Sequence, residues 1–236
     1  MSSILDYRLD GQAGMVTGAA NGIGKALAIG LAEAGASIVV ADLPSQRENA
    51  LDTAREIQAR GAQALVLDLD VTSLPSIEAA IRTTVETFGR IDFLVNCAGV
   101  NIRKPVLEYT EAEWEKIVSV NLKGVFFCTQ IAAREMVKQG HGKIVQIASQ
   151  LAVVAMKDRS IYAITKAGVA HLAKAFALEL GPFGITVNAV GPTFVSTPLT
   201  TAMFSDPAFI AENLPRIPSG RFGTPQDVLG AVRFLL

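Results

Sequence analysis

The stretch Thr17-Gly18-Ala19-Ala20-Asn21-Gly22-Ile23-Gly24 decides the fold, because a short apolar run leads into it and a stretch of helical period follows it. Its glycines permit a tight turn in which backbone N–H groups approach a bound pyrophosphate closely. The first turn of the following helix adds a field that favours negative charge. Strand, glycine-rich turn and helix in this order predict a dinucleotide site. The expected cofactor contacts within the turn are Thr17, Gly18, Asn21, Gly22, Ile23 and Gly24.

Apolar runs rich in β-branched residues alternate with amphipathic stretches along most of the chain. Strands are predicted at residues 14–17, 37–41, 64–68, 93–96, 143–148 and 186–190. Helices are predicted at residues 25–34, 47–60, 74–88, 111–138, 160–181 and 225–236. The strand-like runs are nearly all apolar, as expected for strands that helices cover on both faces. The pattern predicts a single doubly wound α/β domain of the Rossmann type with a parallel sheet, spanning residues 1–236.

One stretch, residues 192–220, interrupts this alternation and holds five prolines. A long irregular insertion in a compact domain usually serves as a lid or a binding segment. We therefore expect residues 192–220 to form a substrate-binding lid within the domain.

The composition excludes several classes of protein. Half of the 236 residues are hydrophobic and 18% are charged, which allows a sizeable core and rules out wholesale disorder. The net charge is -1 without a Lys/Arg-rich run, so no nucleic-acid partner is expected. No apolar run reaches the roughly 18 residues of a membrane span, and residues 1–10 do not resemble a secretory signal. Two cysteines fit a reducing cytoplasm, and His141 and His171 lack the partner spacing of a metal site.

A carboxylate follows the second predicted strand. Asp42 stands about twenty residues after the glycines, where it can accept hydrogen bonds from the adenosine ribose hydroxyls. A 2′-phosphate there would meet like-charge repulsion, and the turn carries Asn21 in place of a basic partner for it. NAD is therefore favoured over NADP. The alternative interpretation is that Asp42 is a solvated carboxylate at a strand end.

The glycine-rich turn is one of several motifs that occur together in a fixed order. The others are Asp70-Val71, Asn96-Cys97-Ala98-Gly99, Asn121, Ser149, Tyr162-Ala163-Ile164-Thr165-Lys166 and Gly191-Pro192. With this set, the chain resembles the short-chain dehydrogenase/reductase family from about Leu9 to its end. A Tyr-x-x-x-Lys pair alone is commonplace on helices, whereas the whole set in this order is specific.

The resemblance implies a role for each of four polar residues. Tyr162 would be the general acid/base at the substrate oxygen, and Lys166 would lower its pKa and hold the nicotinamide ribose. Ser149 would hydrogen-bond the reacting oxygen, and Asn121 would anchor a water that relays protons. The spacing agrees with these roles, because residues four apart on a helix share a face and an ammonium favours a phenolate.

The resemblance also implies further cofactor contacts beyond the glycine-rich turn. Two of them would touch adenine, three would line the cleft after the fourth strand, and two would close around the nicotinamide. In that order, the residues are Asp70, Val71, Asn96, Ala98, Gly99, Pro192 and Thr197, with Tyr162 and Lys166 completing the set.

Two features depart from the family's pattern. Cys97 stands where the family usually has a second asparagine; a small buried thiol should preserve the structure, although its place beside the cleft makes it a candidate for oxidation. The family also continues beyond the position of Leu236 into one further strand and a short tail, so six of its seven strands are expected here. The resemblance implies a homo-oligomer, a tetramer.

Substrate evidence comes from the residues after the fourth predicted strand. Residues 96–127 look similar to those of family members acting on gluconate-type sugar acids and polyols. Arg103 suits a carboxylate or a sugar hydroxyl, unless it is part of a solvated basic pair with its neighbour. With Gln150, Ser149 and Tyr162 it completes the expected substrate contacts. We therefore expect reversible oxidation of a secondary alcohol on a sugar acid, a polyol or a related small hydroxy compound.

Two other functions stay open. A 3-oxoacyl thioester reductase of the same family would use NADPH and a basic docking patch, and Asp42 and the near-zero net charge argue against both. A nucleotide-sensing protein that has lost its chemistry would show changes first at Ser149, Tyr162 or Lys166. All three residues are present.

Overall fold

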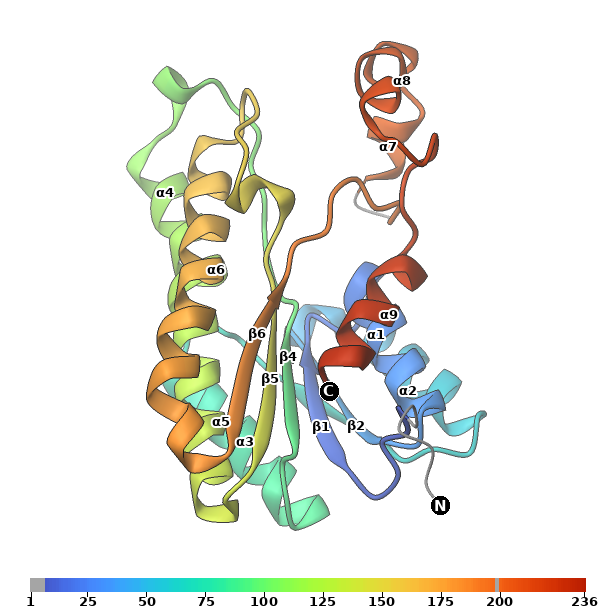
Figure 1. The fold of residues 1–236 in the computed structure, drawn as a ribbon, viewed down its shortest axis with the longest axis vertical. Helices are drawn as coiled ribbons and strands as arrows, with labels where there is room; N and C mark the ends of the chain where they lie inside the picture. Colours follow the sequence, from blue (N-terminus) through green and yellow to red (C-terminus); the bar gives the residue numbers. More distant parts are fainter. Residues whose placement is uncertain (1–6, 198–199) are drawn as a thin grey trace.

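The computed structural model describes residues 7–197 and 200–236 and shows one α/β domain built on a six-stranded sheet (Figure 1). Every strand pairing is parallel, and the strand order is β3-β2-β1-β4-β5-β6. This is the order of a doubly wound sheet, which grows from its centre toward one edge and then toward the other. The predicted fold class is therefore confirmed. The strands are β1 (Ala13–Thr17), β2 (Ser37–Asp42), β3 (Ala64–Asp68), β4 (Phe93–Asn96), β5 (Gly142–Ile147) and β6 (Ile185–Val190).

Helices cover both faces of the sheet. In Figure 1, α3, α5 and α6 lie on one face, and α1, α2 and α9 lie on the other. No helix in the described part of the chain is long and apolar enough to cross a membrane. The covering helices are α1 (Gly22–Glu33), α2 (Arg47–Gln58), α3 (Leu74–Phe88), α5 (Val125–Gln139), α6 (Ser160–Leu180) and α9 (Pro225–Leu235).

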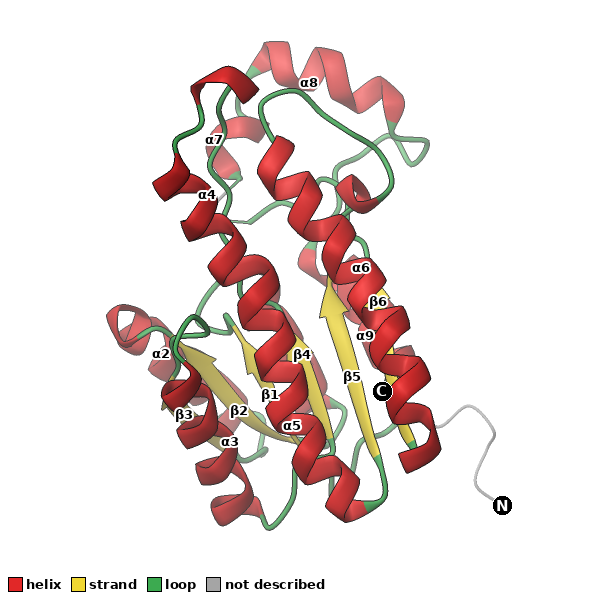
Figure 2. Ribbon diagram, turned by 90° about the vertical axis from the view of Figure 1, so that its left-hand side faces the viewer, coloured by secondary structure: helices red, strands yellow, loops and turns green. Residues whose placement is uncertain are grey.

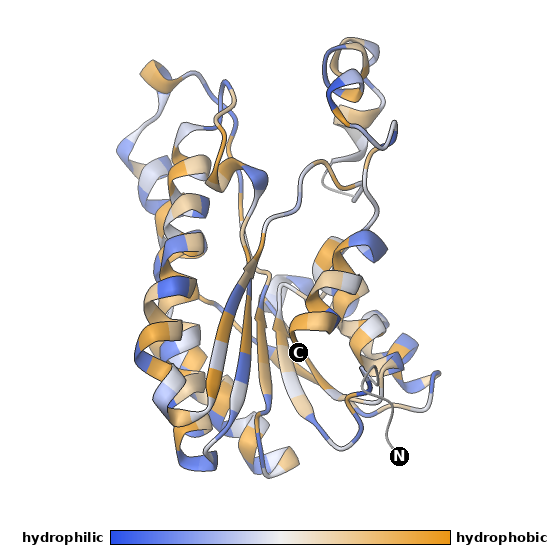
Figure 3. Cartoon of the chain, in the orientation of Figure 1, coloured by the Kyte–Doolittle hydropathy of each residue, from blue (hydrophilic) through white to orange (hydrophobic). Residues whose placement is uncertain are grey.

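The core consists of two apolar layers, one on each face of the sheet. Val16 belongs to one layer and Leu94 to the other, and both side chains are fully buried. Figure 3 shows hydrophobic residues along the central strands and recurring along each covering helix. Gly14 makes this packing possible in β1, because a Cβ there would lie 2.2 Å from the ring of Phe93. Each fully buried aliphatic side chain contributes roughly 1.5–3 kcal/mol to stability.

The single helix predicted over residues 111–138 is wrong in its middle. The structure has α4 (Glu111–Val118), a π-helical turn (Ser119–Gly124) and then α5. The turn contains Asn121, whose side-chain amide accepts from the Val100 N–H and donates to the Val100 carbonyl, at 2.8 Å each. The wider turn accommodates this buried amide, a feature often found at functional sites and invisible to hydrophobic periodicity.

The predicted lid, residues 192–220, is less irregular than its prolines suggest; residues 198 and 199 lie outside the described residues. It contains α7 (Thr201–Phe204) and α8 (Pro207–Asn213), which are too short to show a helical period in the sequence. Aromatic packing holds the segment together, with the ring centroids of Phe194 and Phe209 5.2 Å apart, and the ring of Phe204 stacks 4.3 Å from that of Phe222 just beyond it. Val195 and Gly223 form a parallel bridge where the segment leaves and rejoins the domain.

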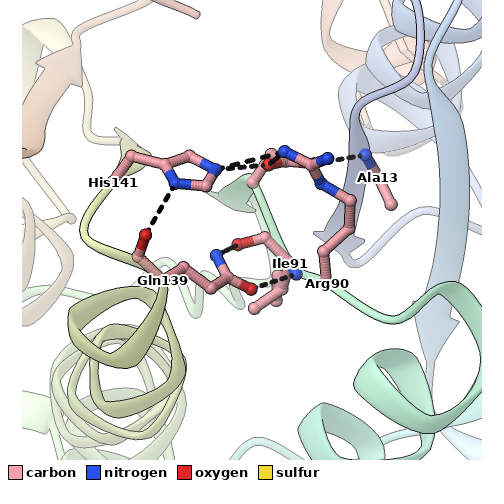
Figure 4. Close-up of polar contacts among 6 residues, drawn as sticks. Ala13, Arg90, Ile91, Gln139 and His141 are labelled. Atoms are coloured by element: carbon pink, nitrogen blue, oxygen red, sulfur yellow. Dashed lines mark hydrogen bonds and ion pairs between the residues drawn. The ribbon is translucent and has the colours of Figure 1, made fainter.

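At the amino ends of the strands, a buried carboxylate ties three segments together (Figure 4). Asp92 accepts hydrogen bonds from Arg90 through both oxygens, at 2.6 and 2.7 Å, and from the Ala13 N–H at 2.8 Å. His141 Nε2 lies 2.8 Å from the same carboxylate. The neighbouring Gln139 side chain exchanges two hydrogen bonds with the Ile91 backbone, at 3.0 Å each. This cluster joins the starts of β1, β4 and β5.

The carboxyl ends of the strands point toward α7 and α8 (Figure 2). β1 and β4 are neighbours there although they are not consecutive along the chain, so the strand order reverses between them. Open parallel sheets bind their ligands in the crevice at such a point. The predicted site residues lie at this edge: Thr17, Asp42 and Asn96 end their strands, and Ser149 and Pro192 follow theirs by two residues.

Candidate active site

The glycine-rich turn between β1 and α1 has the shape of an anion cradle. Gly18 has a φ of +67°, and a Cβ there would lie 2.8 Å from the Ala98 Cα, so a larger residue does not fit. A Cβ at Gly24 would lie 2.1 Å from the Gly18 carbonyl oxygen. Asn21 begins α1 without a side-chain hydrogen bond to the helix, and no acidic residue stands in its first turn. These uncapped N–H groups fit a pyrophosphate.

Asp42 ends β2 directly beside this turn. Its carboxylate accepts from the Ala20 N–H at 2.9 Å and from the Leu43 N–H at 2.8 Å. The carboxylate thus fixes the turn while standing where the ribose is expected. Arg47, the next basic residue along the chain, donates to Asp68 at 2.8 Å and is already paired. This end of the cradle therefore presents the Asp42 carboxylate, whereas the guanidinium of Arg47 is engaged by Asp68.

Two predicted cofactor residues hold neighbouring segments in place. Thr17 Oγ1 accepts two consecutive backbone N–H groups just after β4, each at 3.1 Å. The buried Asn96 side chain donates to Thr129 at 3.1 Å and to Gln146 at 2.9 Å. The Thr17 side chain thus holds the loop after β4, whereas the Asn96 side chain ties β4 to β5 and α5, and contact of Asn96 with a cofactor stays a prediction.

The turn after β3 lies beside the adenosine end of the cradle, because the Leu69 N–H donates to the Asp42 carbonyl at 2.7 Å. Asp70 Oδ1 accepts from the Thr72 N–H and hydroxyl, at 2.9 and 2.7 Å, and so forms the turn itself. Val71 is partly buried and packs against the buried apolar core on one face of the sheet. Contact of Asp70 and Val71 with adenine stays a prediction.

α6 brings Tyr162 and Lys166 to the carboxyl edge of the sheet. The Lys166 Nζ lies 5.6 Å from the centroid of the Tyr162 ring and donates to the Ile147 carbonyl at 2.7 Å. The Ser149 side chain, two residues beyond β5, hydrogen-bonds Tyr162. The structure therefore brings together the three residues predicted to act on the substrate. A Cβ at Gly99 would lie 3.7 Å from the Lys166 Nζ, so the loop after β4 adjoins this group.

Burial governs the protonation of the Tyr162 and Lys166 side chains. It raises the pKa of Tyr162 above its ordinary value, against a hydrogen bond from Ser149 and the positive charge of Arg159, which act to lower it. Burial also lowers the pKa of Lys166 to about 8. The Lys166 ammonium lies over the Tyr162 ring while it donates to the Ile147 carbonyl, and its lowering of the Tyr162 pKa stays a prediction.

Asn121 lies in the π-helical turn with its side chain completely buried. Besides its two hydrogen bonds to Val100, its amide donates to Thr165 at 3.3 Å. A Cβ at Gly99 would lie 3.3 Å from its Oδ1. The side chain fixes the loop after β4 against α6, and a water relay through Asn121 stays a prediction.

The predicted lid meets the site at two points. The Pro192 carbonyl accepts from the Gln150 N–H at 2.9 Å. The Thr197 side chain lies 3.5 Å from the position of a Cβ on Gly22, so Thr197 stands over the glycine-rich turn. Gln150 is fixed here through its backbone, and contact of its side chain with a substrate stays a prediction.

The basic pair after β4 separates in the structure. Lys104 forms an ion pair with Glu113 at 2.7 Å, whereas the Arg103 Nη2 lies 2.8 Å from the Met203 Sδ in α7. Arg159, which sequence reasoning missed, also approaches this sulfur, with its Nη2 at 3.7 Å. Its signal in the sequence is a basic residue one helical turn before the tyrosine of the motif.

Burial raises the pKa of the Cys97 thiol to about 12, which disfavours the reactive thiolate. The expectation of an oxidisable thiol beside the cleft is therefore not supported. Among residues 7–197 and 200–236, no three His, Cys, Asp or Glu side chains are grouped to hold a metal ion.

Comparisons with known proteins agree with this geometry. A family model described as enoyl-(acyl carrier protein) reductase matches residues 18–236. A 2-dehydro-3-deoxy-D-gluconate 5-dehydrogenase from Dickeya dadantii is 36% identical over 230 residues, which cover 97% of this chain and 89% of that protein. A 3-oxoacyl-[acyl-carrier-protein] reductase from Synechocystis sp. is 37% identical over 228 residues, which cover 96% and 90% respectively.

Solved structures are also similar to this chain, at levels of sequence identity close to those of the two relatives above. The crystal structure of a gluconate 5-dehydrogenase from Burkholderia cenocepacia, in complex with NADP and tartrate, matches with a TM-score of 0.92 at 38% sequence identity. The match covers 98% of this chain and 89% of that one. The chain therefore belongs to the short-chain dehydrogenase/reductase family, whose members are oxidoreductases that bind a nicotinamide cofactor.

Proposed function

We propose that this chain is an NAD-dependent oxidoreductase that interconverts a secondary alcohol and a ketone on a sugar acid, a polyol or a related small hydroxy compound. The observation that carries the proposal is the group formed by Ser149, Tyr162 and Lys166 at the sheet edge that also holds the glycine-rich turn. When bound, the nicotinamide supplies or accepts the hydride. The relatives from Dickeya and Burkholderia, both dehydrogenases of gluconate-type compounds by name, support the substrate class.

In this proposal, the protein's part is to position the substrate oxygen and to move one proton. Ser149 holds the oxygen, and Tyr162 takes its proton during oxidation or returns it during reduction. Lys166 holds the nicotinamide ribose, and its buried ammonium keeps a positive charge beside the Tyr162 ring. The water relay from Asn121 would carry the proton away from this group.

Cofactor choice follows from Asp42 in the same proposal. Its carboxylate stands beside the glycine-rich turn, and Arg47 is engaged by Asp68. A 2′-phosphate would face the Asp42 charge, which supports NAD over NADP. Replacing Asp42 by Ala should raise the ratio of NADP to NAD efficiency about tenfold or more, measured as kcat/KM for each cofactor. An unchanged ratio would count against Asp42 as the selecting residue.

The experiment that tests the function is absorbance at the reduced-nicotinamide band, with NAD and NADP separately, against polyols, sugar acids and simple secondary alcohols. NAD-dependent turnover that falls by about 10²–10⁴ in Tyr162→Phe is the expected result. Cofactor binding without turnover of any alcohol or ketone, thioesters included, would favour a nucleotide sensor instead.

A second candidate is a 3-oxoacyl thioester reductase, which the Synechocystis relative favours by its name and its 37% identity. This candidate predicts NADPH-dependent reduction of acetoacetyl-coenzyme A. Turnover of that thioester, together with no turnover of sugar acids or polyols, would replace the first proposal with this one.

We further propose that the protein works in the cytoplasm as a homotetramer. Cys97 and Cys128 are unpaired in the structure, which suits a reducing compartment. Phe126 of α5 and Ile164 and Leu178 of α6 leave much of their apolar surface exposed on one face of the domain, and a second copy could cover it. Light scattering on the purified protein tests this assembly, and a monomer would contradict it.

A further inference from the structure

Two guanidinium groups meet beside the candidate active site. The Nη2 atoms of Arg103 and Arg159 lie 2.8 and 3.7 Å from one atom, the Sδ of Met203. Arg103 comes from the loop after β4, and Arg159 is the residue immediately before α6, three positions before Tyr162. A segment of the predicted lid thus covers a pair of positive charges at the edge of the site.

The spacing of this pair is fixed by the backbone around it. The Lys104 N–H donates to the Asp158 carbonyl at 3.1 Å, which ties the residue after Arg103 to the residue before Arg159. The Tyr109 hydroxyl reinforces the tie by donating to the Ile102 carbonyl at 2.6 Å, and it lies 3.5 Å from the Asp158 carbonyl. The two arginines are therefore held together as a unit.

Their common partner is a poor one. A thioether sulfur is only a weak acceptor, whereas a carboxylate accepts two parallel hydrogen bonds from a guanidinium. Elsewhere in the molecule, Arg90 has such a carboxylate in Asp92. Within the described ranges, neither Arg103 nor Arg159 has a carboxylate oxygen at ion-pair distance.

The electrostatics agree with this geometry. Burial lowers the pKa of the Arg159 guanidinium, and the charge of Arg103 acts in the same direction. Asp158, Tyr109 and Tyr162 act in the opposite direction, with smaller effects. The exposed Arg103 and the partly buried Arg159 therefore repel each other, and an incoming anion would relieve this repulsion.

We propose that Arg103 and Arg159 together bind a carboxylate of the substrate, and that Met203 moves aside when it binds. The inference rests on the proposed function and narrows it, because it selects hydroxy acids over neutral polyols. Arg159 stands one helical turn from Tyr162, so the carboxylate lies only a few bonds from the reacting carbon. The phosphates of an acyl thioester are many bonds from the 3-oxo carbon and do not suit this place.

The test compares matched pairs of an acid and the alcohol in which CH₂OH replaces the carboxylate. The pairs are D-gluconate and sorbitol, D-glycerate and glycerol, and L-threonate and L-threitol. The readout is the ratio of kcat/KM for acid to alcohol in wild type, Arg103→Gln and Arg159→Gln. The control is Arg134→Gln, because Arg134 is exposed on α5 and its hydrogen-bond partner within the described residues is Gln130.

We expect the acid-to-alcohol ratio to fall about 10- to 100-fold in each of Arg103→Gln and Arg159→Gln, and to stay constant in Arg134→Gln. An unchanged ratio in a variant that still turns over NAD would overturn the carboxylate site and leave the proposed function standing. Wild type that turns over none of the pairs would instead count against the proposed function.

If wild type turns over none of the pairs, a calorimetric titration tests the carboxylate site by binding alone. Wild type with NAD is titrated with each acid and each alcohol, and so is Arg159→Gln. Tighter binding of an acid than of its alcohol, lost in the variant, supports the site. Equal binding of acid and alcohol, or no binding of either, overturns it. Thermal melting of each variant checks that the fold is intact.

A charge placed on the lid gives an independent check. Met203→Glu brings a carboxylate of the chain itself to the two guanidinium groups, so it should compete with the substrate and raise the KM for the preferred acid about tenfold. Met203→Gln has nearly the same size without the charge and should raise it much less. Equal effects of both substitutions would argue against an anion site.

Discussion

Two buried charged groups lie at opposite edges of the same sheet, and their surroundings differ. Asp92, at the amino edge, has a side chain 3% exposed and accepts from Arg90, the Ala13 N–H and His141. Lys166, at the carboxyl edge, is 4% exposed, and within the described residues its one hydrogen bond goes to the Ile147 carbonyl.

The pKa values of the two groups express this difference. Burial acts to raise the pKa of Asp92, but the hydrogen bonds from Arg90, Ala13 and His141 outweigh it, and the pKa lies below its ordinary value. Burial lowers the pKa of Lys166 to about 8, because little opposes it. A charge whose neighbours satisfy it stabilises a fold, whereas a charge kept in spite of burial is typical of a site that binds or reacts.

The largest effect expected from this comparison is on turnover in Lys166→Met. The substitution keeps an unbranched chain and removes the ammonium, so kcat should fall about 10²–10⁴-fold. The free energy of unfolding at pH 7 should change by no more than about 1 kcal/mol, because the loss of one hydrogen bond offsets the relief of a buried charge. Steady-state kinetics and urea denaturation measure the two. A Lys166→Met variant that loses stability and keeps turnover would show that Lys166 at the carboxyl edge serves the fold and not the reaction.

The matching substitution at the amino edge is Asp92→Ala, with the opposite expectation. It leaves the Ala13 N–H and the Arg90 guanidinium without their common acceptor, which should cost about 3 kcal/mol of unfolding free energy. Turnover of the folded fraction should stay within about twofold of wild type, since this cluster lies at the far edge from the candidate active site. Urea denaturation and initial rates at low temperature provide the comparison.

The pH dependence of stability sharpens the contrast further. An unfolded lysine has a pKa near ~10.4, and the folded value is about 8, so between these values the unfolded chain binds more protons. Stability contributed by this group therefore rises with pH through that window and is lowest below pH 8. The unfolding free energy of wild type minus that of Lys166→Met should rise by about 1–3 kcal/mol from pH 7 to 10. If the unfolding free energies of wild type and Lys166→Met change in parallel with pH, Lys166 is not desolvated.

Much of the fold and of the candidate active site could be predicted from the sequence, because patterns within short segments determine them. The glycine-rich turn, the apolar strands and the Tyr-x-x-x-Lys spacing placed Gly18, Ser149, Tyr162 and Lys166 at one edge. The rest depends on contacts between distant segments. In the π-helical turn, Asn121 hydrogen-bonds Val100, which is 21 positions away along the chain. The periodicity of apolar residues within one segment does not predict such a contact.

Arg159 escaped sequence reasoning for the same reason. Its importance comes from meeting Arg103 and Met203, which lie 56 and 44 positions away along the chain. The amino-edge cluster is a similar case, since His141 and Asp92 are 49 positions apart. The sequence gives the residue types, whereas the folded structure determines which distant residues contact the same atom.

The smallest expected effect concerns His141, whose side chain is half exposed while Asp92 is buried. His141→Ala should cost only about 1 kcal/mol, because water can replace the lost contact and Arg90 keeps its two hydrogen bonds to the carboxylate. Arg90 and His141 share the Asp92 Oδ1, at 2.6 and 2.8 Å, so their contributions should not be additive. A double-mutant cycle with Arg90→Ala should show a coupling of about 0.5 kcal/mol or more. Additive losses would mean that Asp92 is satisfied by each partner separately, and that the amino edge is a set of independent contacts.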